Sequence, residues 1–350
     1  MNKYDEKYDI RLANRGDIQS IMQFINEYWC EGHIMAKDRI LFEYEYVDKD
    51  NVNFVLAIDK ETKCIEGIFG FINTSYTEEY DKKYIWGSMW KVNDKHDNIP
   101  LLGIELARRV HDLTHCKRHI GNGANSNTTI PLRRLFFGEK VAKMKQYYYL
   151  NTSMSEYKIA KIEKQEIFGV PKVEKNKYVI KFNSMEEVKK EFKVEAVDAI
   201  PYKDSWYVEK RFFKHPYYKY NVYGIREEDY KVGALLVTRH VEYGGSKVIR
   251  IMDYIGKQEL FSKISSTLYQ EMIEGNYEYI DMYTLGFKEE YILEAGFKLK
   301  DDQDINIIPN YFEPFLRENV DIWCHYKDEE TLFFKADGDQ DRPNQLRNNN

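Results

Sequence analysis

The sequence has few cysteines, no long apolar run and no early apolar segment. Its four cysteines, Cys30, Cys64, Cys116 and Cys324, are scattered and form no CxxC pair, which is usual in a reducing cytoplasm. No apolar run reaches the roughly 18 residues of a membrane span. The first ten residues, MNKYDEKYDI, carry acids in place of the apolar core of a secretory signal. We therefore expect a cytoplasmic protein with no membrane partner.

Basic residues are not in excess either. The chain of 350 residues has Lys+Arg 52 against Asp+Glu 58, a net charge of −6, which argues against a nucleic-acid partner. At roughly 150 residues per domain the length suggests about two domains. With 43% hydrophobic and 31% charged residues, the chain can build ordinary globular cores.

The spacing of apolar residues predicts the helices and strands in the first part of the chain. It predicts a helix over Asp17–Trp29, a helix that opens at Pro100, and a helix from about Thr128 to Phe137. The strands expected around these helices lie at 53–58, 65–72, 84–92, 118–124 and 144–150.

The second half repeats this order of elements. Its expected strand 247–255 corresponds to 84–92 at an offset of 163, and Gly296 corresponds to Gly138 at an offset of 158. The pattern predicts an α/β (α+β) protein of two tandem domains, each a mixed, mostly antiparallel sheet flanked by helices. We place their boundaries at 1–151 and 199–335, with a polar connector at 152–198 and a polar tail at 336–350.

The junction WGSMWKVNDKHDNIPLLGIEL joins a strand to a helix. Pro100 suits the first helical position, and Asn98 can cap it. The unpaired N–H groups and dipole of such a helix start suit a diphosphate, and Gly103 allows close approach. An ordinary capped connection would show the same pattern.

The segment GNGANSNTTIPLRRLFFGEK is a second informative stretch. Asn127 or Thr128 can cap a short helix that ends at Gly138. Arg133 and Arg134 lie on this helix and could meet a phosphate or form solvated surface.

Together these elements resemble the GNAT superfamily of acyl-CoA N-acyltransferases, and the ending LFFG at 135–138 matches the family. The family loop reads (Arg/Gln)-x-x-Gly-x-(Gly/Ala). Here it is Asn98-x-x-Leu101-x-Gly103, without the leading cation and the first glycine. The resemblance implies that strand 84–92 splays from its neighbour and binds pantetheine, and that the helix start holds the pyrophosphate. It places acyl-CoA, a co-substrate, in the first domain at Met89, Trp90, Val92, Ile99, Leu101, Gly103, Asn127 and Arg133.

Two later segments, EKRFFKHPYYKYNVY and ADGDQDRPN, narrow the resemblance. They resemble tandem GNAT N-acyltransferases of nucleotide-linked (dTDP) amino sugars in surface-polysaccharide biosynthesis, such as the dTDP-anthrose pathway. The resemblance implies a nucleotide-sugar site in the second domain. Its expected substrate-binding residues are Arg211, His215, Tyr217, Asp337 and Asp339. An edge strand with a half-buried aromatic face and a solvated tail are the alternatives.

Neither histidine nor aspartate spacing favours a metal. The segment 111–119 contains three histidines and Cys116 but no HExxH pattern, and the Asp-rich segment 337–341 lacks the glutamate that a calcium loop carries at its twelfth position. We expect no metal.

Acyl transfer to an amine needs a neutral amine and protonation of the leaving thiolate. A sugar amine is partly neutral near pH 8, so direct attack with modest base assistance suffices. We expect Asp94 to act as base or to orient the amine, Ser88 to bind substrate or thioester, and His96 to be the alternate base. Asp94 as a turn former and Ser88 as a small buried residue are the other interpretations.

Two other functions are open. Cell-wall aminoacyl transferases also use tandem GNAT units, but they need aminoacyl-tRNA, and this acidic chain shows no basic helical arm. A non-catalytic binding protein with the same fold would account for the incomplete phosphate loop.

Overall fold

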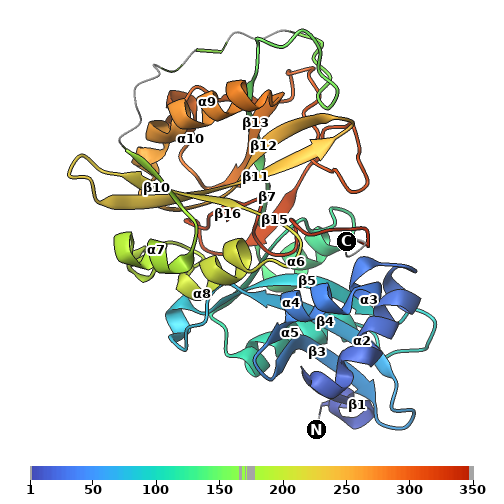
Figure 1. Ribbon diagram of the computed structural model, residues 1–350. Coiled ribbons are helices and arrows are strands. Elements are labelled where there is room, and N and C mark those ends of the chain that lie inside the picture. Colours follow the sequence, from blue (N-terminus) through green and yellow to red (C-terminus); the bar gives the residue numbers. More distant parts are fainter. Residues whose placement is uncertain (1, 165–167, 170, 172–177, 347–350) are drawn as a thin grey trace. The chain divides into compact units, whose positions relative to one another are not determined.

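The structure is a computed structural model that describes residues 2–164, 168–169, 171 and 178–346. The chain divides into two compact units. The first comprises residues 1–140, 325–327 and 338–350, and the second comprises 141–324 and 328–337. Each unit has its own sheet, as Figure 1 shows. No helix in the described ranges is long and apolar enough to cross a bilayer.

The sheet of the first unit runs in the order β1-β3-β4-β5-β6. The pairs β1–β3, β3–β4 and β4–β5 are antiparallel, whereas β5–β6 is parallel. The strands β15 (Trp323–Tyr326) and β7 (Lys140–Lys143) continue this sheet, and the boundaries between the units fall inside them. The strand bounds are β1 Tyr8–Asn14, β2 Val47–Asp48, β3 Asn51–Asp59, β4 Ile65–Asn73, β5 Tyr84–Val92 and β6 Arg118–Asn122.

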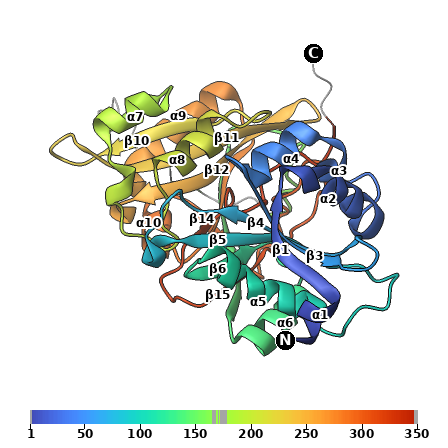
Figure 2. The same cartoon turned by 90° about the horizontal axis from the view of Figure 1, so that it is seen from below.

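Helices cover both faces of this sheet (Figure 2). Val55 of β3 packs with Leu106 of α5, whereas the neighbouring Phe54 contacts the rings of Phe42 and Tyr46 in α4 at 5.7 and 4.6 Å. Because adjacent strand residues point to opposite faces, α5 and α4 lie on opposite sides. The helix bounds are α1 Lys3–Lys7, α2 Ile18–Phe24, α3 Ile34–Lys37, α4 Arg39–Tyr46, α5 Leu102–Thr114 and α6 Thr129–Phe137.

The sheet of the second unit runs in the order β14-β8-β13-β12-β11-β10-β9, with β16 paired to β13. The pair β12–β13 is parallel, and the other pairs are antiparallel. The strand bounds are β8 Lys145–Leu150, β9 Val179–Phe182, β10 Asn221–Arg226, β11 Val232–Tyr243, β12 Ser246–Gly256, β13 Tyr279–Leu285, β14 Lys298–Lys300 and β16 Phe333–Phe334.

The strand predicted at 144–150 is β8, and it does not complete the first sheet as we expected. It lies between β13 and β14 of the second sheet, where Leu150 is opposite Tyr279. Tyr147, Tyr148 and Leu150 are buried. A strand buried on both faces needs a partner on each edge, and its own sequence does not say which sheet supplies them.

Helices also cover the second sheet. Figure 1 shows α9 (Ser265–Gly275) and α10 (Glu289–Glu294) on one side, and α7 (Met185–Glu191) and α8 (Ser205–Val208) on the other. The core under α9 contains Tyr254, while its neighbour Asp253 contacts Tyr207 of α8.

Two expected polar segments are part of these units. The connector 152–198 contributes β9, which pairs with β10, and its residues 165–167, 170 and 172–177 lie outside the described residues. The tail is not solvated throughout, because Asp337 is buried in the second unit and Asp341 in the first. The alternative of a solvated tail is therefore wrong up to Pro343, the last buried residue among those that the structure describes.

Candidate functional site

Strand β5 loses regular pairing on both edges. Against β4, Phe69 is opposite Trp90 but Phe71 is opposite Gly87, so two residues, Ser88 and Met89, face one. This is a β-bulge, a feature frequent beside active sites. Against β6, the parallel register covers only Tyr84–Trp86 in the described structure. The strand thus diverges from its neighbour at the place where the sequence predicted a splay.

Buried polar side chains fill the space beside this divergence. A Cβ on Gly87 would lie 2.2 Å from Nε2 of His119, so the glycine makes room for the imidazole. Nη2 of Arg133, from α6, lies 3.0 and 2.9 Å from the two ring nitrogens of His119. The Arg133 guanidinium also covers the ring of Trp90 at 5.0 Å. Met89 is buried, and Val92 is half-buried.

Arg133 is 1% exposed, so it is not solvated surface. Burial lowers its pKa to about 10. Its Nη1 lies 3.6 Å from Glu139, which also meets Nδ1 of His325 at 2.8 Å. Nε and Nη1 of Arg133 have no hydrogen-bond partner among the described residues. Asn127, at the start of the same helix region, is exposed.

The helix start after β5 differs from the prediction. Helix α5 begins at Leu102 and not at Pro100, and Leu101 precedes it with a left-handed backbone (φ 67°). Asn98 does not cap it, because its Oδ1, the acceptor that a cap would use, accepts from the Tyr8 hydroxyl at 2.8 Å, and its NH₂ group donates to Glu66 and to the Asn93 carbonyl.

Tyrosines of the N-terminal segment tie the loop before α5. The hydroxyl of Tyr8 accepts from the Ile99 N–H at 3.0 Å, and the hydroxyl of Tyr4 donates to the Pro100 carbonyl at 2.8 Å. Behind Gly103, the indole of Trp90 donates to the Gly103 carbonyl at 2.9 Å. The loop is therefore held in one conformation, with Leu101 exposed at its tip.

Ser88, on the bulge, belongs to a polar group on the opposite face of the sheet. Its Oγ lies 3.0 Å from the hydroxyl of Tyr46, whose pKa burial raises. Arg342 contacts Tyr46 and also pairs with Asp339 at 3.1 Å. Two residues predicted from distant parts of the sequence, Ser88 and Asp339, are thus joined through two that were not predicted.

Asp94 and His96 lie on the exit loop of β5, away from this group. Oδ2 of Asp94 meets Nζ of Lys91 at 2.7 Å, and this hydrogen bond and charge lower the pKa of Asp94. Nδ1 of His96 meets Oε1 of the buried Glu66 at 2.8 Å. Both side chains are exposed at 67% and 54%, open to any ligand that reaches the loop.

Strand β12 of the second unit repeats the pattern of β5. Against β11, Val237 is opposite Asp253 but Thr238 is opposite Ile251, so Met252 is the extra residue of a bulge. Against β13, the parallel register covers only Ile249–Ile251 in the described structure. Beyond that point, β16 pairs with the end of β13.

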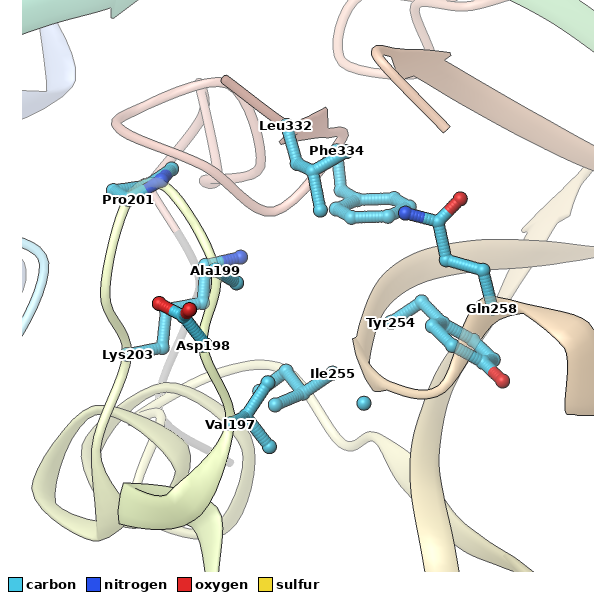
Figure 3. A pocket seen from close by; sticks show the side chains of 11 residues that line it. Val197, Asp198, Ala199, Pro201, Lys203, Tyr254, Ile255, Gln258, Leu332 and Phe334 are labelled. Atoms are coloured by element: carbon cyan, nitrogen blue, oxygen red, sulfur yellow. The ribbon is translucent and has the colours of Figure 1, made fainter. Parts of the chain in front are cut away.

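An open cleft lies at the end of β12. It has a narrow part of about 70 Å³ and a wide part of about 560 Å³, which share Val197, Asp198, Gly256 and Gln258. Figure 3 shows the narrow part between the loop that carries Ala199 and Pro201, the end of β12, and Phe334 of β16.

A buried ion cluster lies at the base of the narrow part. Nζ of Lys203 meets Oδ1 and Oδ2 of Asp253, both at 2.8 Å, and Oδ1 of Asp337 at 2.7 Å. Tyr207 donates to Asp253 at 3.0 Å. Burial raises the pKa of Asp337 to about 6, against the opposing charge of Lys203. Asp337, predicted as a sugar ligand, therefore lies beside a cleft but within an ion cluster.

The residues of the segment 209–223 that we predicted to bind a nucleotide sugar are mostly buried. Arg211 and His215 are 5% and 8% exposed, and Tyr217 is half-buried. Nδ1 of His215 accepts from the backbone N–H groups of Tyr217 and Tyr218. Arg211 and His215 therefore do not form an exposed surface, and the ring of His215 supports the local backbone. Their role toward a nucleotide sugar stays a prediction.

Sequence reasoning missed Tyr46, Arg342, Lys203 and Asp253. Long-range packing brings Tyr46, Arg342 and Lys203 to a bulged strand, whereas Asp253 lies on β12 itself, next to its bulge. The one signal available was the repeat itself, since the equivalents of 84–92 in the second half carry Asp253.

No family model and no curated protein matches this sequence. Among solved structures, the chain is similar to a GCN5-related N-acetyltransferase from Anabaena variabilis ATCC 29413, with 9% identity, a TM-score of 0.53, and coverage of 91% of this chain and 72% of the other. It is also similar to a probable N-acyltransferase from Enterococcus faecalis V583, with 10% identity, a TM-score of 0.55, and coverage of 84% and 70%. The chain therefore has the GNAT fold, in two tandem units.

Proposed function

We propose that the protein transfers an acyl group from acyl-CoA to the amino group of a nucleotide-linked amino sugar. The observation that carries the proposal is the interrupted strand at the centre of each sheet. β5 and β12 each have a bulge on one edge and leave their parallel neighbour on the other. A strand that diverges from its neighbour before a helical segment can offer backbone groups to an extended ligand. At the β12 bulge the Met252 carbonyl already accepts from the Ala336 N–H at 2.9 Å.

The reaction needs a neutral amine to attack the thioester carbonyl. The new C–N bond forms as the C–S bond breaks, the amine loses one proton, and the thiolate gains one. Tyr46 is not suited to protonate the thiolate, because burial raises the pKa of its hydroxyl beside Ser88 and so makes it a weaker acid. The proton that the amine loses on attack can pass to the thiolate, directly or through water.

Asp94 stays our predicted base or amine-orienting residue. Asp94→Asn keeps the shape and removes the basicity, and we expect kcat to fall on the order of 10²-fold, with partial recovery at higher pH. The measurement is steady-state rates between about pH 6.5 and 9.5 together with the melting temperature.

The matched control is Asp97→Asn, an exposed aspartate on the same loop. Wild-type kcat for Asp94→Asn at every pH would remove Asp94 from the mechanism and make His96 the next residue to test. A lower melting temperature with unchanged kcat would identify Asp94 as a turn residue.

The direct test of the function is mass spectrometry of products from acetyl-CoA with a panel of dTDP- and UDP-linked amino sugars. Acylated sugar in any reaction supports the proposal, and its absence from all of them contradicts it. A thermal-shift screen separates the alternatives. Stabilisation by uncharged tRNA alone favours the aminoacyl transferase, and no stabilisation by CoA, dTDP or tRNA favours a non-catalytic protein.

A further inference from the structure

Gly256 lies where the narrow and wide parts of the cleft in the second unit join. Gly256 has φ 124°, and a Cβ there would lie 2.5 Å from the Gly233 carbonyl oxygen and 2.7 Å from Cα of Ala234. The end of β12 is therefore pressed against β11. The loop that follows can run along the cleft without a side chain at this point.

Lysines line the wide part. Lys193, Lys257 and Lys288 contribute to its wall, together with Glu227 and two further acids, Glu259 and Asp198. Among the described residues, Lys193 and Lys288 have no carboxylate within ion-pair distance. Lys257 pairs with Glu227 at 2.6 Å, but the two side chains are 51% and 34% exposed. Such a pair contributes little and can exchange partners for an anionic ligand.

The narrow part differs in character. Val197, Ile255, Leu332 and Phe334 form apolar parts of its wall. Asp198, Lys203 and Gln258 line it as well, and Lys203 is held in the ion cluster with Asp253 and Asp337. The side-chain oxygen of Gln258 accepts from the Lys288 N–H at 2.8 Å, while its amide N–H₂ donates to no group in the described part of the chain. An amide or hydroxyl of a ligand could accept from it.

A wide part with lysines and a narrow part that combines apolar side chains with the Gln258 amide suit a ligand with an anionic head and a thin arm. We propose that this cleft binds a nucleoside diphosphate conjugate, with the diphosphate at Lys193, Lys257 and Lys288 and the attached group beside Gln258. The assignment rests on the proposed function in one respect. Both of its co-substrates, acyl-CoA and a nucleotide-linked sugar, belong to this chemical class.

The position of the diphosphate is tested by reversing the charge of a lysine in the wide part. Lys257→Glu should weaken binding of CoA or of dTDP-glucose by about tenfold or more in calorimetry, and the wild-type affinity should fall as salt rises. The matched control is Lys161→Glu, because Lys161 is similarly exposed and paired with a glutamate but lies outside the cleft. Equal affinities for the two variants, both folded by circular dichroism, would overturn the proposal.

Removing an acidic side chain from the wide part should have the opposite effect on affinity. Glu259→Gln removes a negative charge from the cleft without a change of shape. It should tighten binding of the same conjugate several-fold if a diphosphate lies beside it. Unchanged or weaker binding in this variant would contradict a diphosphate at this position.

The position of the group attached to the diphosphate is tested at Ala199, which lines the narrow part. Ala199→Trp fills this space and should reduce the affinity for a conjugate relative to its bare nucleotide. A selective loss for CoA relative to ADP identifies the acyl donor as the ligand. A selective loss for dTDP-glucose relative to dTDP identifies the nucleotide sugar. A selective loss for neither overturns the proposal.

Binding is measured here without turnover, so the two proposals fail separately. Conjugate binding that depends on Lys257, with no acylated product, would contradict the proposed function alone. Product formation with binding that is insensitive to Lys257, Glu259 and Ala199 would contradict this site alone.

Discussion

The strands β5 and β12 have the same backbone pattern, but the space beside each is used differently. Each pairs with its parallel neighbour over three residues, Tyr84–Trp86 in one and Ile249–Ile251 in the other. Each then has a bulge on its antiparallel edge. Beside β5 the space is occupied by His119 and Arg133, which are 3% and 1% exposed. Beside the end of β12 an open cleft remains.

The difference shows that side chains from outside the repeated strands decide what a diverging strand can do. In the first unit, α6 supplies Arg133, which closes the space with a buried guanidinium. In the second unit, β16 pairs with the far end of β13, and the Ala336 N–H that follows it donates to the Met252 carbonyl of β12. The loop at 197–203 forms the opposite wall of the cleft. The backbone repeat therefore does not determine which unit is open.

The largest effect on the free energy of unfolding should come from removing the Arg133 side chain, which fills the space beside β5. Arg133→Met removes a buried guanidinium and leaves Glu139 beside His325 without it. Breaking a buried pair in this way should cost about 3–5 kcal/mol of unfolding free energy, measured by urea denaturation.

The neighbouring Arg134 gives the control, because it is exposed on the same helix. Arg134→Met should change the free energy of unfolding by less than about 0.5 kcal/mol. The double variant Arg133→Met/Glu139→Gln should recover part of the loss. Equal effects of the two single variants would contradict a buried, charge-dependent closure of the first unit.

The ion cluster beside the open cleft predicts a pH effect on stability. Burial raises the pKa of Asp337 to about 6 from an ordinary 3.8, so between these values the folded state holds the proton more tightly than the unfolded state. The contribution of this group to stability is full below about pH 4 and is lost as pH rises through 6, by at most about 3 kcal/mol.

Asp337→Asn should remove this dependence. We expect the stability of wild type relative to the variant to decline from about pH 4 to pH 7 in urea denaturation. Asp229→Asn is a control of opposite sign, because Lys231 lowers the pKa of this exposed carboxyl. A wild-type-minus-variant difference that is flat with pH would show that Asp337 does not titrate in this range.

The fold was predictable because hydrophobic periodicity reports local structure. The expected strand 84–92 is β5, and the helix expected to end at Gly138 does so, with Gly138 in the left-handed region (φ 59°). The assignment of 144–150 to the first sheet failed because strand pairing is a long-range property. The prediction that Asn98 caps the helix failed because its Oδ1, which would accept a helix N–H, accepts from the hydroxyl of Tyr8, 90 residues away.

The site was less predictable for the same reason. Ser88 could be chosen because it lies on a predicted strand, and the structure places it on the bulge. Its contact with Tyr46 spans 42 positions, and the contact of Lys203 with Asp253 spans 50. No local spacing marks such pairs. Arg133 was ambiguous in sequence because a helical arginine can be solvated or buried, and only the packing of α6 decides.

The smallest expected effect addresses which strand holds the acyl donor. If the CoA diphosphate lies at the start of α5, as the sequence predicts, Gly103→Glu places a carboxylate beside it and should weaken CoA binding by more than tenfold, or more than about 1.4 kcal/mol. A Cβ at this position would lie 3.1 Å from Nε1 of Trp90, so part of any loss could arise from a shifted indole. Gly103→Gln has the same size without the charge and isolates the electrostatic part. If Gly103→Glu loses affinity for CoA while Gly103→Gln and Lys257→Glu keep the wild-type affinity, the donor lies in the first unit beside β5. Wild-type affinity in both Gly103 variants, with a loss in Lys257→Glu, moves the donor to the open cleft of β12 and leaves the closed first unit without a role in donor binding. Calorimetry of the four proteins with CoA, each verified as folded by circular dichroism, separates these outcomes.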